Sequence, residues 1–223
     1  IQSDLIYRAT VRHIRKSHGN AIVGLIFNIL QAALFVAVFY FLFMLIGIGG
    51  MKVRGDFLLY LMTGIFLFMT HTKTIQAVVK SEGPAAPIMK HSPMTTVIST
   101  TSAACAALYI QILTLMVVLL VYHVAWTPLE IYQPARAVMM LLLSWASGFA
   151  IGLVFLALKP WAPNAVSLLT NVYTRANMFA SGKMFLANSL PGHMLVYFSW
   201  NPLFHTIDQS RGFSFINYNP HNT

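Results

Sequence analysis

Residues 179–211 decide the fold of this chain, and they read FASGKMFLANSLPGHMLVYFSWNPLFHTIDQSR. The stretch is too rich in apolar and aromatic side chains to lie in water as an ordinary loop. It is interrupted at Pro191-Gly192 and again at Asn201-Pro202, so it does not cross a bilayer as one simple helix. Non-helical backbone at membrane depth is tolerated only where protein buries it or where it lines a cavity. We therefore expect a pair of short helices that dip into the membrane, with the rest of the chain building a pathway around them.

The whole chain has the composition of a membrane protein. Hydrophobic residues make up 57% of it and charged residues only 9%, and its mean hydropathy is +0.69, whereas a soluble domain carries about 25% charged residues. Several charge-free apolar runs of about 20 residues predict an all-α, polytopic helical membrane protein. The net charge of +9 fits cytoplasmic loops and anionic lipid. No basic stripe is interleaved with aromatic residues, so we expect no nucleic-acid partner.

Five apolar segments predict five membrane-spanning helices. They cover residues 21–47, 57–79, 97–121, 137–158 and 164–182. In the first segment Asn28 and Gln31 are the only strongly polar side chains, and we expect them to face protein rather than lipid. Small residues in the third segment, at Ser99, Ser102, Ala103 and Ala106, allow close helix packing. The fourth segment has a small-residue face. These small residues are Ser144, Ser147, Gly148 and Gly152.

The N-terminal segment, residues 3–18, is predicted to form an amphipathic helix. Arg8, Arg12 and Arg15 fall on one stripe beside an apolar stripe. Such a helix lies at the membrane interface and faces anionic headgroups; the alternative is a solvated basic leader with no docking role. The bias of Lys and Arg between the loops predicts a cytoplasmic N-terminus, which places residues 179–211 on the outer side.

Residues 80–93 form the longest loop on the predicted cytoplasmic side. Gly83-Pro84 ends the preceding helix, and Pro87 and Pro93 bracket a short segment. Proline is favoured in the first turn of a helix and disfavoured in its interior. This punctuation predicts a short, isolated helix at the membrane surface.

The sequence contains no motif typical of an enzyme or a metal site. Its eight histidines form no H-E-x-x-H motif, and Cys105 has no second cysteine to pair with. Neither a G-x-S-x-G elbow nor a G-x-x-x-x-G-K-[ST] loop occurs, so we expect no catalytic residue, no metal and no cofactor bound by this chain. The five acids fall near span ends or in loops, which argues against an ion-coupled transporter. They are Asp4, Asp56, Glu82, Glu130 and Asp208.

Arg175 is the most informative single residue, because it interrupts the fifth apolar segment. A centred Arg costs about 2.5–3.5 kcal/mol on insertion scales, so it should face a cavity or a partner. Lys183 follows eight residues later, about 80° round a helix, and both could line a conduit for an anionic substrate. The alternative is that Lys183 reaches outward to the interface while Arg175 pairs with a backbone carbonyl or a lipid phosphate.

Aromatic side chains gather near the second interruption, at Tyr197, Phe198, Trp200 and Phe204. In a channel such residues could stack on sugar rings. The alternative is an interface belt or ordinary packing.

Together these features resemble the membrane subunit of an ABC-2 (type V) exporter of the capsular polysaccharide and O-antigen family. The resemblance covers nearly the whole chain and rests on the order of its parts: a basic amphipathic helix, RHIRKSHGNAIVGLIFNILQAALFVAVFYF, then GDFLLYLMTGIFLFM, then a loop ending Pro87-Ile88-Met89-Lys90. Its most specific piece is MFLANSLPGHMLVYFSWNPLFHTIDQSR, where a break ending in Pro precedes an aromatic segment, Asn-Pro-Leu, a helix and Arg. The matching positions are Pro191, Asn201, Pro202, Leu203 and Arg211. The family often has Glu in the last helix, where this chain has the shorter acid Asp208.

The resemblance implies a homodimeric permease that works with two separate ATPase subunits, which would bind ATP and Mg in place of this chain. It implies that residues 82–93 form the coupling helix that docks into the ATPase. The candidate coupling residues are Glu82, Pro84, Pro87, Ile88, Met89 and Lys90. It also makes residues 179–186 and 191–200 two re-entrant helices of an outer gate, within a gate region of residues 183–211. The implied location is the bacterial inner membrane.

The implied function is ATP-driven export of a cell-surface polysaccharide of the capsule or O-antigen type. The candidate conduit or gate residues are Arg175, Lys183, Tyr197, Phe198 and Trp200. The family has six spans, so we expect the sequence to be cut at both ends and a sixth span to follow Thr223. Two alternatives stay open: export of a drug or small lipid by the same fold, and an integral-membrane enzyme of lipid or glycan metabolism that uses a histidine with an acid.

Overall fold

A computed structural model describes residues 2–16, 21–45, 57–81, 95–126, 128, 130–183, 198–215 and 218. The described residues form seven helices, which confirms the predicted all-α class. The helices are α1 (Gln2–Lys16), α2 (Ala21–Leu45), α3 (Phe57–Lys80), α4 (Thr96–Ala125), α5 (Pro134–Leu158), α6 (Pro163–Ala180) and α8 (Pro202–Ser214).

Four of these helices are long and apolar enough to cross a membrane. They are α2 from Val23 onward and the whole of α3, α4 and α5. Each matches one of the first four predicted spans to within a few residues, because a long apolar run with few charges sets its bounds. The chain is therefore a multi-pass helical membrane protein.

The helix α6, expected as a fifth span over 164–182, is not among these four. Its 18 residues rise about 27 Å at 1.5 Å per residue, slightly less than the roughly 30 Å hydrocarbon core of a bilayer. Polar side chains along it, Arg175 included, also lower its hydropathy. Whether α6 crosses the membrane stays a prediction.

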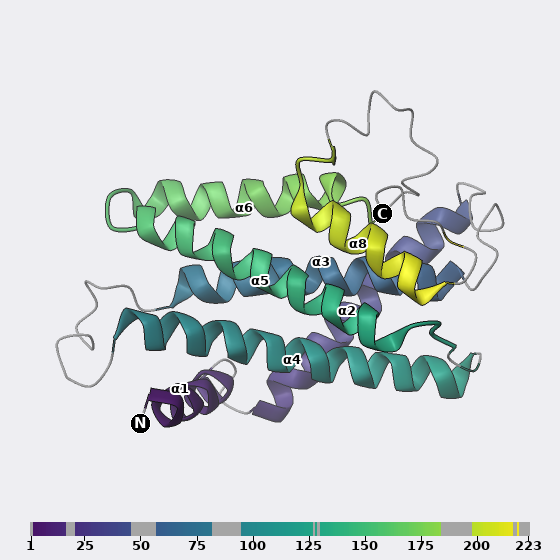
Figure 1. Ribbon diagram of the computed structural model, residues 1–223, viewed down its shortest axis with the longest axis horizontal. Helices are drawn as coiled ribbons and strands as arrows, with labels where there is room; N and C mark the ends of the chain where they lie inside the picture. Colours follow the sequence, from purple (N-terminus) through teal and green to yellow (C-terminus); the bar gives the residue numbers. More distant parts are fainter. Residues whose placement is uncertain are drawn as a thin grey trace.

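The helix α3 forms the centre of the bundle. It contacts α2, α4, α5, α6 and α8, and Figure 1 shows it lying between α4 and α6. Most of its side chains are buried, whereas α2, α4 and α5 each bury only one side and expose the other. Its buried polar residues, such as Thr70, His71 and Thr74, are thereby kept away from lipid.

The predicted small-residue face of α5 packs directly against α3. A Cβ atom added at Gly148 would lie 2.6 Å from the carbonyl oxygen of His71, so the backbones approach too closely for any other residue. The Ser144 hydroxyl donates a hydrogen bond of 2.8 Å to the Leu67 carbonyl across the same contact. At Gly152 an added Cβ would meet Val78 at 2.9 Å. The small-residue face predicted for this segment is therefore the surface at which α5 meets α3.

One end of the bundle carries α1, the end of α3, the start of α4 and the tight turn between α5 and α6 (Figure 1). The N-terminal helix, predicted over 3–18, contacts α4 and α2, and the Thr10 hydroxyl lies 3.5 Å from the Ser102 carbonyl oxygen. The helix α4 begins at Thr95, whose side chain accepts a hydrogen bond from the Ile98 amide. Since four successive helices alternate direction, this end is the one that the charge bias predicts to be cytoplasmic.

Candidate functional site

The end of α6 and the start of α8 meet inside the bundle. The Asn201 side-chain amide donates to Asn177 Oδ1 at 2.6 Å and to the Ala180 carbonyl at 3.2 Å. Its Oδ1 atom accepts from the Leu203 amide at 3.0 Å and so caps α8. One side chain therefore holds both helix ends together, and we call this junction between α6 and α8 the interruption.

Arg211 closes this interruption from the α8 side. Its Nη1 and Nη2 atoms donate to the carbonyls of Gly182 and Lys183 at 2.9 and 3.0 Å. Those carbonyls follow the end of α6, where no helical partner is left for them, and an unpaired backbone carbonyl at membrane depth is costly. The guanidinium lies 3.9 Å over the Tyr60 ring of α3, and the side chain is only 1% exposed.

Two glycines make room for this arrangement. Gly182 has φ +71°, a left-handed conformation that other residues rarely adopt, and an added Cβ there would lie 2.6 Å from the Phe204 ring. On the facing surface of α3, a Cβ at Gly64 would lie 2.8 Å from Arg211 Nη2 and 3.1 Å from the Cα atom of Lys183. The chain between α6 and α8 can approach α3 only because both positions lack a side chain.

The Lys183 ammonium lies in a box of three phenylalanine rings. Its Nζ atom is 3.5 Å from the ring centroid of Phe68, 4.3 Å from that of Phe35 and 5.1 Å from that of Phe39. The side chain is 1% exposed, and Nζ has no hydrogen-bond partner among the described residues. The electron-rich ring faces attract the cation.

A buried acid lies on the same helix as Arg211. Asp208 is 3% exposed and accepts a hydrogen bond from the Tyr218 hydroxyl. Burial raises the pKa of the Tyr218 hydroxyl, and its hydrogen bond to Asp208 raises it further. The phenol therefore stays protonated and remains a donor to the carboxylate.

The residues predicted to form the conduit do not all come together. Arg175 is exposed on α6, whereas Lys183 is buried. The predicted angle of about 80° between them does not apply, because α6 ends at Ala180 and the backbone after it is not helical. Nor does Lys183 reach outward, as the alternative interpretation had it.

The aromatic candidates separate in the same way. Phe198 is half-buried and stacks on Phe204 with ring centroids 6.0 Å apart, while Trp200 is 88% exposed. Tyr197 and Pro191 lie outside the described residues, as does most of the two predicted re-entrant helices. The candidate coupling residues Glu82, Pro84, Pro87, Ile88, Met89 and Lys90 also lie outside them.

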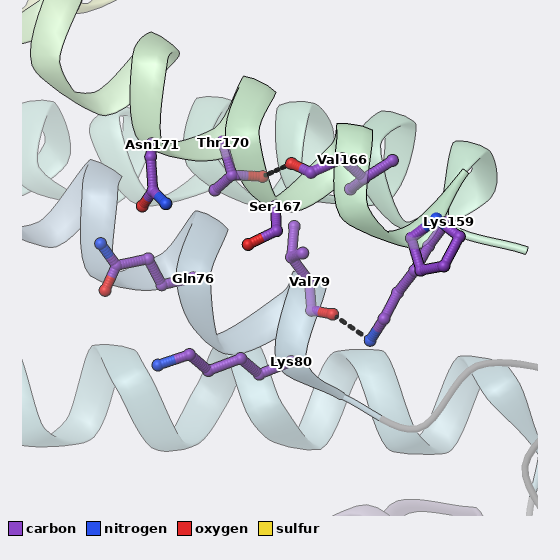
Figure 2. Close-up of a pocket in the computed structure, with 9 residues that line it drawn as sticks. Gln76, Val79, Lys80, Lys159, Val166, Ser167, Thr170 and Asn171 are labelled. Carbon is purple, nitrogen blue, oxygen red and sulfur yellow. Dashed lines mark hydrogen bonds between the residues drawn. The ribbon is translucent and has the colours of Figure 1, made fainter.

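A pocket of about 280 Å³ lies between α3 and α6 at the end where α3 stops. Figure 2 shows Gln76 and Asn171 facing each other across it, with Lys159 reaching from the α5–α6 turn to the last turn of α3. The Lys159 ammonium donates to the Val79 carbonyl at 2.7 Å. Lys80, the last residue of α3, lines this pocket. The predicted coupling segment, residues 82–93, begins two residues later in the sequence.

His71 links three helices. Its Nδ1 atom is 2.9 Å from Ser147 Oγ and its Nε2 atom is 3.1 Å from the Tyr173 hydroxyl. Because the Ser147 hydroxyl donates to the Ser144 carbonyl, Nδ1 is the protonated nitrogen and Nε2 accepts from Tyr173. A histidine in this state orients Ser147 but does not act as its base. No group of three His, Cys, Asp or Glu side chains that could hold a metal ion occurs within the described ranges.

No protein-family model matches the chain, and a search of curated proteins returns no match.

Sequence reasoning missed several polar residues inside apolar segments. Lys73 donates to the side chain of Asn28, which confirms that Asn28 faces protein, whereas Gln31 is exposed on α2. Gln111 is 2% exposed in the middle of α4. A lone polar side chain in an apolar run predicts a contact with protein or a cavity. The same rule applies to Lys73 in the second predicted span and to Gln111 in the third.

Proposed function

We propose that this chain is the membrane-spanning permease subunit of an ATP-driven exporter that moves a cell-surface polysaccharide, of the capsule or O-antigen type, across the bacterial inner membrane. The observation that carries the proposal is the interruption between α6 and α8. Three residues of the family-like motif lie at this point: Asn201 holds both helix ends, Pro202 starts α8, and Arg211 binds the carbonyls after α6.

The interruption gives these motif residues a physical task. Backbone that is not helical needs hydrogen-bond partners at membrane depth. Arg211 and Asn201 supply partners to the carbonyls of Gly182, Lys183 and Ala180. These contacts anchor the chain on both sides of the proposed gate segment, residues 184–197.

The energy for export would come from another chain. The sequence has no G-x-x-x-x-G-K-[ST] loop, so ATP-Mg is assigned to a separate ATPase subunit. The proposed coupling segment follows directly after α3, which contacts five other helices. A displacement of the α3 end by the ATPase would therefore be passed to α6 and α8, which flank the interruption.

A second copy of the chain would complete the conduit. The helix α2 buries little of its surface within one chain, and Arg175 and Trp200 are exposed. An exposed Arg on a membrane-facing helix is costly in lipid and acceptable at a polar conduit between two subunits. The exposure of Arg175 and Trp200 thus supports a homodimer in which both residues face the conduit.

The decisive experiment is reconstitution of the full-length chain in vesicles with and without its candidate ATPase. We expect ATP-dependent translocation of a labelled anionic polysaccharide only when both chains are present. Alanine substitutions across Glu82–Lys90 should lower the transport rate in graded steps while leaving membrane insertion intact. Transport by the permease without the ATPase would contradict the proposal.

The same assay separates the alternatives. Export of a small lipid or a drug but not of a polymer would identify an exporter of the same fold with another substrate. Loss of all activity on changing one histidine or acid, with no dependence on an ATPase, would instead identify an enzyme.

A further inference from the structure

Four helices line an open cavity at the end of the bundle that carries α1. The cavity has a volume of about 580 Å³ and lies between α1, α2, α3 and α4. Both apolar and polar side chains line it, and the polar ones include His13, Asn28, Gln31, Lys73, Lys80 and Gln111. Gln76 and Lys80 line both this cavity and the pocket of Figure 2.

The cavity carries positive charge without a matching acid. Lys73 and Lys80 line it, and no carboxylate occurs among the described residues around it. The Lys73 ammonium donates to Asn28 Oδ1, and the Asn28 amide in turn donates to the Gly24 carbonyl at 2.8 Å. An ammonium has three N–H donors. Lys73 therefore keeps donors for a further acceptor.

Gln111 completes the polar lining on the α4 side. Its side chain is 2% exposed, and its Oε1 atom has no hydrogen-bond partner in the described part of the chain. An amide oxygen only accepts hydrogen bonds, so it does not itself bind an anion. Gln111 instead offers a position, next to Ala103 and Ala106 on the cavity wall, at which a carboxylate can be introduced beside the lysines.

The end of α3 does not repel an anion here. The last carbonyls of a helix carry partial negative charge. In this chain the Val79 carbonyl accepts from Lys159 at 2.7 Å and the Val78 carbonyl accepts from the Ser81 hydroxyl at 2.6 Å. These bonds offset the negative end of the helix, so the charge of Lys73 and Lys80 dominates the cavity.

We infer that this cavity binds the phosphate-bearing headgroup of an anionic phospholipid. A phosphate offers several strong acceptor oxygens and a charge that the two lysines compensate. Lipid is the source because Phe27 lines the cavity and is 62% exposed on the membrane-spanning helix α2, so the cavity borders the lipid-facing surface. The inference concerns the contact between α1 and the bundle, and it does not depend on what the chain exports.

The test measures lipid binding to the full-length chain in a neutral detergent by native mass spectrometry. Phosphatidylglycerol and phosphatidylcholine with the same acyl chains are titrated separately. We expect phosphatidylglycerol to bind at least about tenfold more tightly, and Lys73→Gln combined with Lys80→Gln to remove about tenfold of that preference, because each lysine near a charged headgroup strengthens binding severalfold. Equal binding of the two lipids would overturn the inference.

A matched control removes two exposed arginines of α1 at the same end. Arg8→Gln combined with Arg12→Gln takes away the same charge, but neither arginine lines the cavity. We expect it to weaken phosphatidylglycerol binding only about twofold, because salt screens exposed charges that lie away from the headgroup. A loss as large as that of the lysine variant would mean general attraction to the surface and no headgroup site.

Two further measurements, on a third variant and with inorganic phosphate as competitor, test the site independently of the lysine variant. Gln111→Glu, which has the same shape and places a carboxylate in the cavity, should lower the preference for phosphatidylglycerol even if the lysine variant does not fold. Inorganic phosphate at millimolar concentration should not displace the lipid. Full displacement by phosphate, or a Gln111→Glu variant that binds as the unchanged chain does, would contradict a lipid headgroup site.

Discussion

At the scale of single residues, the two buried cations of the interruption have different environments. Arg211 uses its planar fork to bind two carbonyls at once, which suits a guanidinium. Lys183 is a point charge surrounded by Phe35, Phe39 and Phe68. The arginine therefore satisfies backbone, whereas the lysine is held by ring faces alone among the described residues.

Replacing Arg211 should destabilise the junction between α6 and α8. Arg211→Ala leaves the Gly182 and Lys183 carbonyls unpaired, so we expect a loss of about 2–6 kcal/mol in unfolding free energy at about 1–3 kcal/mol for each buried group. Arg211→Lys should recover part of this loss because an ammonium can still donate to one carbonyl. The measurement is equilibrium unfolding in mixed detergent micelles.

Arg136→Ala is the control for this experiment. Arg136 is exposed at the start of α5, and its guanidinium carbon lies 5.6 Å from the Phe213 ring centroid. An exposed contact of this kind is worth about 0.5–1 kcal/mol. If the Arg211 and Arg136 variants lose the same stability, Arg211 does not hold the interruption.

At the scale of elements, the sequence predicts where helices lie better than how their ends pack together. The first four spans follow from long apolar runs, the break at Asn201-Pro202 is where α8 begins, and the face of Gly148 and Gly152 follows from helical spacing. The contact of Asn201 with Asn177 joins residues 24 apart across non-helical backbone, where no periodicity applies. The direction of Lys183 was not predictable for the same reason, since Gly182 turns the chain after α6.

The contact between α3 and α5 offers a test at this scale. Gly148→Ala places a methyl group within 2.6 Å of the His71 carbonyl oxygen, so the two helices must separate. We expect a loss of about 1–3 kcal/mol in unfolding free energy, typical of overpacking. Ala146→Val adds side-chain volume on the exposed face of the same helix and should change stability by no more than about 0.5 kcal/mol. Equal effects of the two variants would argue against close backbone contact.

At the scale of the whole molecule, charge bias and structure agree on which ends lie together. The helix α1, Lys80 and Lys159 lie at one end, and the start of α5 with Arg136 lies at the other (Figure 1). The sequence predicts this alternation because the chain crosses the membrane once in each apolar run, so successive runs have opposite directions. The two cavities at the α1 end were not predictable, since each depends on how three or four helices pack side by side.

The orientation can be measured with single cysteines. In a Cys105→Ser background, Trp161→Cys marks the α5–α6 turn and Tyr132→Cys marks the segment before α5; both positions are exposed. In intact cells permeabilised only at the outer membrane, a membrane-impermeant maleimide should label position 132 and not position 161, because the positive-inside bias places the N-terminus in the cytoplasm. The reverse pattern would place α1 and both cavities outside.

The double role of Asn201 has a consequence for chain length. One side chain holds Asn177, the Ala180 carbonyl and the start of α8, so the relative placement of the two helix ends is fixed by contacts outside residues 184–197. The entropy of closing a chain between two fixed points grows only slowly with its length. Insertions between residues 183 and 198 should therefore cost little stability and leave the register of α6 and α8 unchanged.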